Sequence, residues 1–178
     1  RTLLTATALA IDLETDGDRI WEIGCARNAQ ASLLHDEHIG TDLDAAMVEL
    51  AERACAAPLV VGHNVLAWDW PIVARHIGPT PAPLIWDTLL IGYLLEPQAA
   101  SHALSGRHHA DQDALDASQL FNRQLERLPA DIAHRVLLGE FGDSDQLLDA
   151  VIEGLPRIAF GRELPAFMTV EGATPEKL

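Results

Sequence analysis

Asp12 and Glu14 stand one residue apart at the end of an apolar run, residues 8–11. Because successive side chains on a strand point to opposite faces, the two carboxylates would share one face, while Leu13 packs on the other. Neighbouring carboxylates at the end of a buried strand repel each other, and burial increases that cost. A divalent cation relieves the repulsion, because hard oxygen ligands suit Mg²⁺ or Mn²⁺. The pair taken alone favours a solvated strand end, with a metal site as the alternative.

Two later segments each add a further candidate carboxylate. In the first, Val60-Val61-Gly62 runs into His63-Asn64, and Trp68-Asp69 follows where a helix could begin. Asp69 is a candidate ligand, with helix N-capping as the alternative. In the second, residues 108–114 (His-His-Ala-Asp-Gln-Asp-Ala) open a long amphipathic pattern. Asp113 lies beside its packed stripe, where an unpaired carboxylate would be costly. It is a further candidate ligand, with an ordinary polar helix position as the alternative.

Taken in order, the three segments resemble the motifs of the DEDDh, or DnaQ-like, 3′–5′ exonucleases. The resemblance covers about residues 8–128 and implies a ribonuclease H-like fold. It also implies an active site in which four carboxylates hold two divalent ions, Mg²⁺ or Mn²⁺. Matched position by position, Asp12 would bridge both ions, Glu14 and Asp113 would each bind one ion, and Asp69 would act through a water.

The resemblance further implies a general base, a histidine on the loop five residues before the last aspartate. His108 has that spacing, and an imidazole titrates near neutral pH. His109 is the alternative, because at about 100° per residue it would lie on nearly the same helical face as Asp113 if both were inside the helix. We favour His108. Outside the motif, either histidine would be an ordinary surface or capping residue.

Three further positions match the part of the family's cleft that meets the terminal nucleotide, namely Thr15, His63 and Asn64. Turn capping by short polar side chains is the alternative for His63 and Asn64. Trp68 stands where the family usually has Phe, and we expect it to be a core aromatic rather than a base-stacking one. The segment between residues 87 and 108 is short, so the wall that guides the substrate strand would be reduced.

Composition places the chain among ordinary globular proteins. Its 178 residues, 48% hydrophobic and 22% charged, are enough for one domain with a sizeable core. No apolar stretch approaches the roughly 20 residues that cross a bilayer, and no signal-peptide pattern opens the chain. Cys25 and Cys55 are too few for a disulfide framework. These features predict a cytoplasmic protein without membrane contact.

The formal charge of −15, from 12 Lys plus Arg against 27 Asp plus Glu, is unusual for a protein that grips long nucleic acid. Acidity could simply aid solubility. Alternatively, the domain could bind only a few terminal nucleotides, while a neighbouring domain binds the rest of the strand. We expect residues 1–154 to form the exonuclease domain and the proline-punctuated residues 155–178 to be a tail or interdomain linker. A fused helicase or other DNA-processing domain is the expected partner, since the chain begins at Arg1.

Hydrophobic periodicity predicts the elements that would position these residues. Strands are expected over 7–13, 19–27, 31–39, 58–63 and 84–86, and helices over 42–55, 68–77, 88–95, 110–128, 130–138 and 145–153. Three adjacent strands followed by helix, strand, helix and strand imply an α/β fold, a mixed five-stranded sheet with helices on both faces.

Two functions of different classes fit these patterns. The favoured one is a metal-dependent 3′–5′ exonuclease that removes mononucleotides from single-stranded ends, with DNA favoured over RNA. The alternative is a nuclease-fold module that binds nucleic acid or a protein partner with little or no catalysis. The presence of all the motif residues favours the enzyme.

Overall fold

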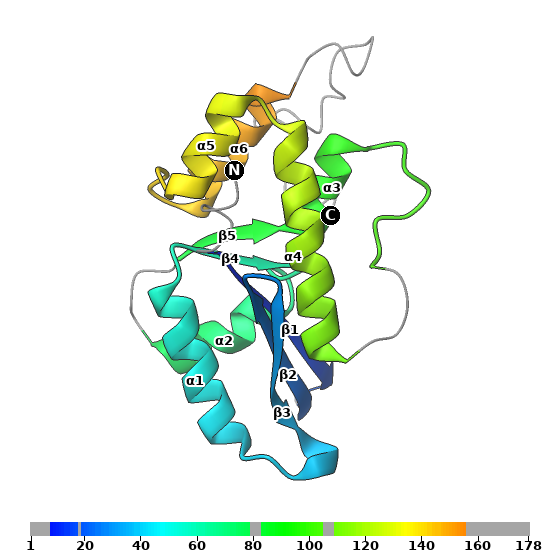
Figure 1. Ribbon diagram of the computed structural model, residues 1–178, viewed down its shortest axis with the longest axis vertical. Helices are drawn as coiled ribbons and strands as arrows, with labels where there is room; N and C mark the ends of the chain where they lie inside the picture. The colour runs from blue at the N-terminus through cyan, green and yellow to red at the C-terminus, as the bar shows by residue number, and fades with distance from the viewer. Residues whose placement is uncertain (1–7, 18, 79–82, 105–108, 156–178) are drawn as a thin grey trace.

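The computed structural model describes residues 8–17, 19–78, 83–104 and 109–155 (Figure 1). Within them, three adjacent strands precede a region of alternating helices and strands, and helices complete the described chain. In chain order the elements are β1 (Ala8–Asp16), β2 (Arg19–Arg27), β3 (Gln30–Asp36), a 3₁₀ turn (Glu37–Ile39), α1 (Leu43–Ala56), β4 (Leu59–Gly62), α2 (Asp69–Ile77), β5 (Leu84–Asp87), α3 (Thr88–Leu95), α4 (Ala110–Arg127), α5 (Ala130–Leu138) and α6 (Ser144–Gly154).

The strands form one sheet in the order β3-β2-β1-β4-β5. β1, β2 and β3 are antiparallel neighbours, whereas β4 runs parallel to both β1 and β5. A parallel pair needs a crossover connection, which α1 supplies between β3 and β4 and α2 supplies between β4 and β5. The expected mixed five-stranded α/β sheet is therefore confirmed.

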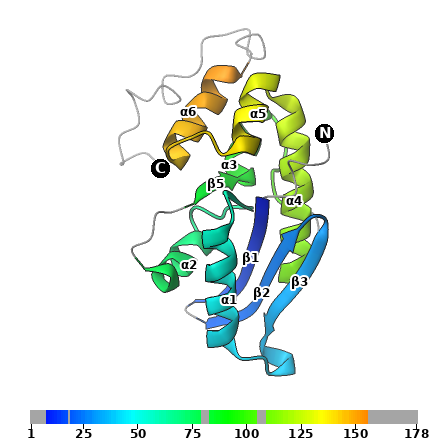
Figure 2. The same ribbon diagram turned by 60° about the vertical axis from the view of Figure 1, so that its left-hand side comes forward.

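Helices cover both faces of this sheet, with α1 and α2 on one side and α4 on the other (Figure 2). On β1 the odd-numbered positions 9, 11 and 13 are buried in the cluster that includes α1 and α2. Ala10 instead joins the cluster that contains Phe121 of α4. Because a strand alternates its side chains, Asp12 and Glu14 follow Ala10 onto the face covered by α4.

Gly24 on β2 sets how closely α4 approaches the sheet. A Cβ atom at this position would lie 2.1 Å from the carbonyl carbon of Ala110 and 2.2 Å from the backbone nitrogen of Asp111. Only glycine leaves room for the first turn of α4 to rest directly on the strand. This close approach brings Asp113, in the same first turn, to the sheet beside β1.

Element boundaries agree with the sequence-based expectations to within three residues. β1 extends to Asp16 rather than ending at residue 13, because it continues its pairing with β2. A tight hairpin joins β2 to β3, with Asn28 and Ala29 at φ values of 55° and 60°, as a two-residue type I′ turn requires. β3 ends at Asp36, earlier than expected, because its carboxylate accepts a hydrogen bond from His38 and caps the 3₁₀ turn.

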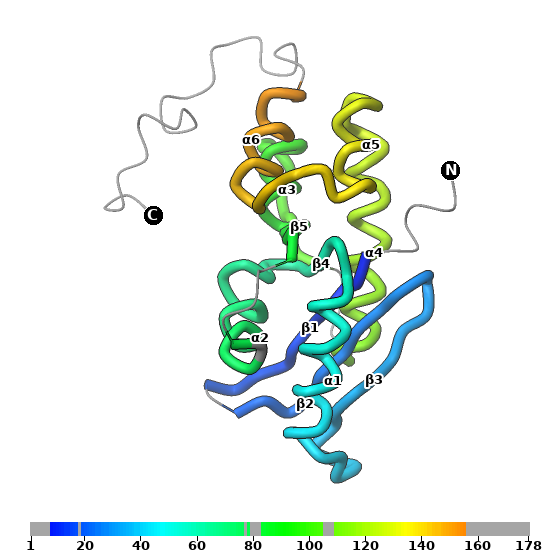
Figure 3. Tube along the Cα trace, turned by 90° about the vertical axis from the view of Figure 1, so that its left-hand side faces the viewer, coloured from blue at the N-terminus to red at the C-terminus, as the bar shows by residue number. Residues whose placement is uncertain are grey.

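Helices α5 and α6 pack together at the β5 end of the sheet, away from the β2–β3 hairpin (Figure 3). The described chain ends at residue 155, so the expected tail over 155–178 lies almost wholly outside the described residues. The division into residues 1–154 and 155–178 stays a prediction. Among the described helices, none combines the length and apolar character that crossing a membrane demands.

Candidate metal centre

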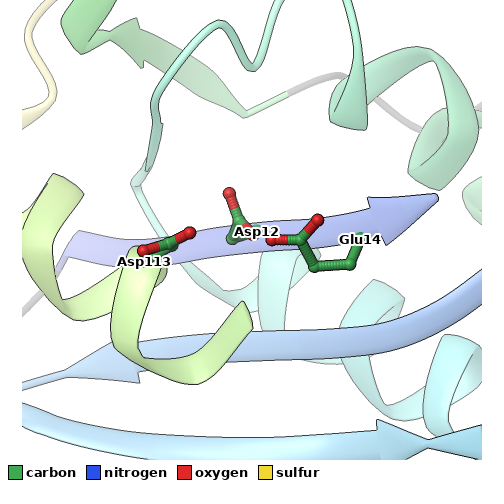
Figure 4. Close-up of side chains that lie close together, drawn as sticks. All are labelled: Asp12, Glu14 and Asp113. Atoms are coloured by element: carbon green, nitrogen blue, oxygen red, sulfur yellow. The ribbon is translucent and has the colours of Figure 1, made fainter. Parts of the chain in front are cut away.

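Three carboxylates from two elements converge at the face of the sheet that α4 covers. Asp12 and Glu14 come from β1 and Asp113 comes from α4, and each offers an oxygen within 4.8 Å of the others (Figure 4). All three side chains are partly buried rather than sealed from solvent. Such a set of hard oxygen donors with an open side fits Mg²⁺ or Mn²⁺. The structure thus brings together three of the four ligands expected from the sequence.

The electrostatics of the cluster show the cost of holding these groups without a cation. Burial, and then the charges of Asp69, Glu14 and Asp113, raise the pKa of Asp12 to about 9. Burial and the charge of Asp113 also raise the pKa of Glu14. The charged forms are therefore disfavoured in the metal-free protein. A bound divalent cation reverses that preference, since it stabilises the ionised carboxylates.

Asp69 lies next to the three carboxylates without joining them. It is the first residue of α2, whose N-cap is Trp68, so Asp69 is not the N-cap. Its Oδ1 accepts a hydrogen bond of 2.9 Å from the backbone nitrogen of Leu13 on β1. Burial raises the pKa of Asp69 to about 7, and the Leu13 hydrogen bond opposes this rise. Its position within electrostatic reach of Asp12 is compatible with a contact to the metal through water.

Asp87 organises the loop that delivers α2 to the site. Its carboxylate accepts hydrogen bonds from Asn64 and Leu66 of the loop, at 3.0 and 3.1 Å. It also accepts from Leu89 and Leu90 at the start of α3, at 3.0 and 3.2 Å. One buried carboxylate thereby satisfies four backbone donors and fixes two segments together. No local pattern in the sequence indicates the contact to the loop, which joins residues more than 20 positions apart.

Glu22 is a buried carboxylate beside the cluster that sequence analysis missed. It lies opposite Glu14 in the antiparallel register and is fully buried. Its Oε1 is 2.7 Å from Nδ1 of His109, and its Oε2 accepts from the backbone nitrogen of Ala110 at 2.9 Å. An anion at a helix N-terminus is favourable, so Glu22 holds the first turn of α4 in place. A charged residue inside the apolar strand Ile-Trp-Glu-Ile was the available signal.

Of the two candidate general bases, the structure describes only His109. His108 lies outside the described residues, so its role stays a prediction. His109 is the N-cap of α4, and its imidazole uses Nδ1 in the bond to Glu22. That hydrogen bond and the charge of Glu22 raise the pKa of His109.

The residues expected to meet the substrate flank the carboxylates. Trp68, expected in the core, is 53% exposed, and its indole nitrogen donates to Oγ1 of Thr15 at 2.9 Å. The expectation was wrong because Trp68 ends the loop before α2 instead of packing inside the helix. Nδ1 of His63 lies 3.0 Å from Oγ1 of Thr88, and burial lowers the pKa of His63. Asn64 has a left-handed backbone with φ of 62°, typical of a turn residue.

Searches of the chain against protein-family models, curated proteins and solved structures find no match. Function is therefore inferred from the chain's own residues. The arrangement can hold a divalent cation between β1 and α4, with polar and aromatic side chains beside it that could contact a ligand.

Proposed function

We propose that this chain is a metal-dependent 3′–5′ exonuclease of the DEDDh type, with a ribonuclease H-like arrangement of its sheet. It would hydrolyse phosphodiester bonds at single-stranded nucleic-acid ends, DNA in preference to RNA. The observation that carries the proposal is the convergence of Asp12, Glu14 and Asp113, three residues that the motif order singles out for this purpose. Asp69, the fourth motif carboxylate, lies within electrostatic reach of Asp12.

The donor set fits divalent cations, because its oxygens come from carboxylates whose ionised forms need positive charge nearby. Two ions, Mg²⁺ or Mn²⁺, would supply an activated water and neutralise charge on the leaving oxygen. In the proposed arrangement Asp12, Glu14 and Asp113 would hold these ions, and Asp69 would act on them through a water.

The remaining roles belong to groups around the carboxylates. His108 accepts the proton of the attacking water as general base. Thr15, His63 and Asn64 contact the terminal nucleotide. The net charge of −15 limits the grip on long polyanions. It suits one domain of a larger DNA-processing protein in which a helicase or similar domain holds the rest of the strand.

The proposal is tested by incubating the chain with 5′-labelled single-stranded DNA and RNA, with Mg²⁺, Mn²⁺ or a chelator. We expect ladders that shorten from the 3′ end with either cation, and none with the chelator. Cleavage that continues in the chelator would contradict the metal mechanism. A chain that binds single strands and leaves them intact with both cations would instead be a binding module of the nuclease type.

A further inference from the structure

A cavity of about 520 Å³ lies between α3 and α4. The two helices lie side by side (Figure 1). Residues of α4 from Asp116 to Arg127 form one wall, α3 from Thr88 to Leu95 contributes to another, and residues 101–104 complete the lining. The volume falls within the range of roughly 300–1,000 Å³ that ligand sites occupy.

The cavity adjoins the metal centre. Asp116, on its wall, lies one helical turn beyond Asp113 on α4. His63 links the two regions, because its imidazole is within electrostatic reach of both Asp113 and His102. Its Nδ1 is also bonded to Thr88, which lines the cavity. A nucleic-acid strand whose end lies at the carboxylates would therefore have this cavity beside it.

Two polar groups of the cavity lack partners within the described part of the chain. Nε2 of His102 is buried and makes no hydrogen bond there, a deficit that costs on the order of 1–3 kcal/mol. Arg123 forms no ion pair with any described residue, whereas Arg127 pairs with Glu96. Gln124 is also committed, because its amide contacts other groups of the protein. Among the described residues, the cavity thus contains one cation without an ion pair and one buried imidazole nitrogen without a hydrogen bond, beside the carboxylate of Asp116.

We propose that this cavity binds the sugar-phosphate backbone of the nucleotides that precede the terminal one, with Arg123 contacting a phosphate and Nε2 of His102 contacting a backbone oxygen. The inference rests on the exonuclease function proposed above, which brings the strand's end to the carboxylates. Arg123 lies ten residues beyond Asp113, about 15 Å along the helix, so the contact is internal to the strand. Phosphate suits this position because the guanidinium fork matches its oxygens.

The test measures how affinity depends on strand length. Fluorescein-labelled dT2, dT4 and dT8 are titrated by anisotropy in a chelator, where no cleavage is expected, against the wild type, Arg123→Ala and Arg123→Lys. Arg75→Ala is the matched control, because it removes the same charge from α2 on the opposite face of the sheet. Cleavage of dT8 with Mn²⁺ is followed separately.

We expect the ratio of the dT2 and dT8 dissociation constants to fall about tenfold in Arg123→Ala, as loss of one charged phosphate contact predicts. The salt slope for dT8 should fall by about 0.7. Arg123→Lys should retain part of the ratio and Arg75→Ala all of it. A ratio unchanged in Arg123→Ala, equal weakening of dT2 and dT8, or no binding of any oligonucleotide would overturn the proposal.

The outcomes separate this proposal from the proposed function. If cleavage proceeds while the ratio of dissociation constants is unchanged in Arg123→Ala, the cavity proposal fails and the exonuclease proposal stands. If no strand is cleaved while the ratio still depends on Arg123, the exonuclease proposal fails and the strand contact stands. Competition by thymidine 5′-monophosphate that abolishes the dT8 advantage would assign the cavity to a released mononucleotide, and would overturn the strand contact.

Discussion

Glu14 and Glu22 lie directly opposite each other in the register of β1 and β2, yet their carboxylates contact different groups. Glu14 joins Asp12 and Asp113 in the acidic cluster, where burial and the charge of Asp113 raise its pKa. Glu22 accepts hydrogen bonds from the N-terminus of α4. One carboxylate is therefore available to a metal ion, while the other fixes the helix that carries the third ligand.

Substituting these two glutamates should have opposite effects on stability. In Glu22→Gln the first turn of α4 loses a charged acceptor, so we expect the free energy of unfolding to fall by about 1–3 kcal/mol. Glu14→Gln removes a repelling charge, so the metal-free protein should be as stable as the wild type or more so. Urea denaturation in a chelator measures both. Equal destabilisation by the two variants would contradict these separate roles.

Stability of the metal-free protein should depend on pH through Asp12. Its pKa is raised to about 9 in the folded protein, from an ordinary value near 4 in the unfolded chain. Between these values the unfolded chain is ionised while the folded protein keeps the proton, so the free energy of unfolding falls as pH rises from about 4 to 9.

Thermal or urea unfolding between pH 5 and 9 in a chelator measures this decline. Asp12→Asn should flatten it, because the variant cannot titrate at that position. Mn²⁺ should also oppose the decline, since it stabilises the ionised form. Stability that rises over this range in the chelator would show that Asp12 is ionised without metal.

Gly24→Ala should disturb the carboxylate cluster by displacing α4 from β2. The added methyl would lie within 2.2 Å of the backbone of α4, so the helix must shift, at a cost of about 1–3 kcal/mol. Asp113 would move with the helix, and Mn²⁺ affinity should fall. Gly92→Ala is the control, because its added Cβ would meet side-chain atoms of His102 and Gln124, at 3.1 and 3.6 Å, rather than the backbone of α4. Metal affinity unchanged in Gly24→Ala would contradict the idea that this contact positions Asp113.

The three clustered carboxylates could be predicted because local patterns decide their positions. Strand alternation places Asp12 and Glu14 on one face, and the helical stripe from Ala110 turns Asp113 toward the sheet. Those periodicities also determine the sheet and its helices, which is why the element boundaries agree closely. Convergence of the two elements then follows from one tight contact at Gly24.

Other features depend on partners distant in the sequence. Glu22 bonds a nitrogen 88 residues away, and Asp87 bonds a loop nitrogen 23 residues away. No local pattern specifies such a pair, so neither of these two contacts could be predicted. The prediction that Trp68 is buried was wrong for a related reason. The exposure of Trp68 depends on how the loop after β4 enters α2 rather than on the hydrophobicity of its side chain.

Substitutions of the two adjacent histidines should have different effects on the cleavage rate. His108→Ala should reduce the cleavage rate on the order of 10²–10⁴-fold with little change in stability, as removal of a general base does. His109→Ala should cost less rate, because Nδ1 of His109 is engaged with the structural carboxylate of Glu22. Single-turnover cleavage at saturating Mn²⁺ compares the two variants. The reverse ranking would assign the base to His109.

The most direct measurement of the metal-centre account compares Asp113→Asn with Asp111→Asn. Both variants remove one negative charge from the first turn of α4, but only Asp113 belongs to the carboxylate cluster. Mn²⁺ binding by calorimetry, followed by cleavage of 5′-labelled single-stranded DNA, is measured for each. The account predicts that Asp113→Asn loses most of its Mn²⁺ affinity and its 3′ cleavage, while Asp111→Asn retains both. Equal losses in the two variants, or full activity in Asp113→Asn, would contradict it.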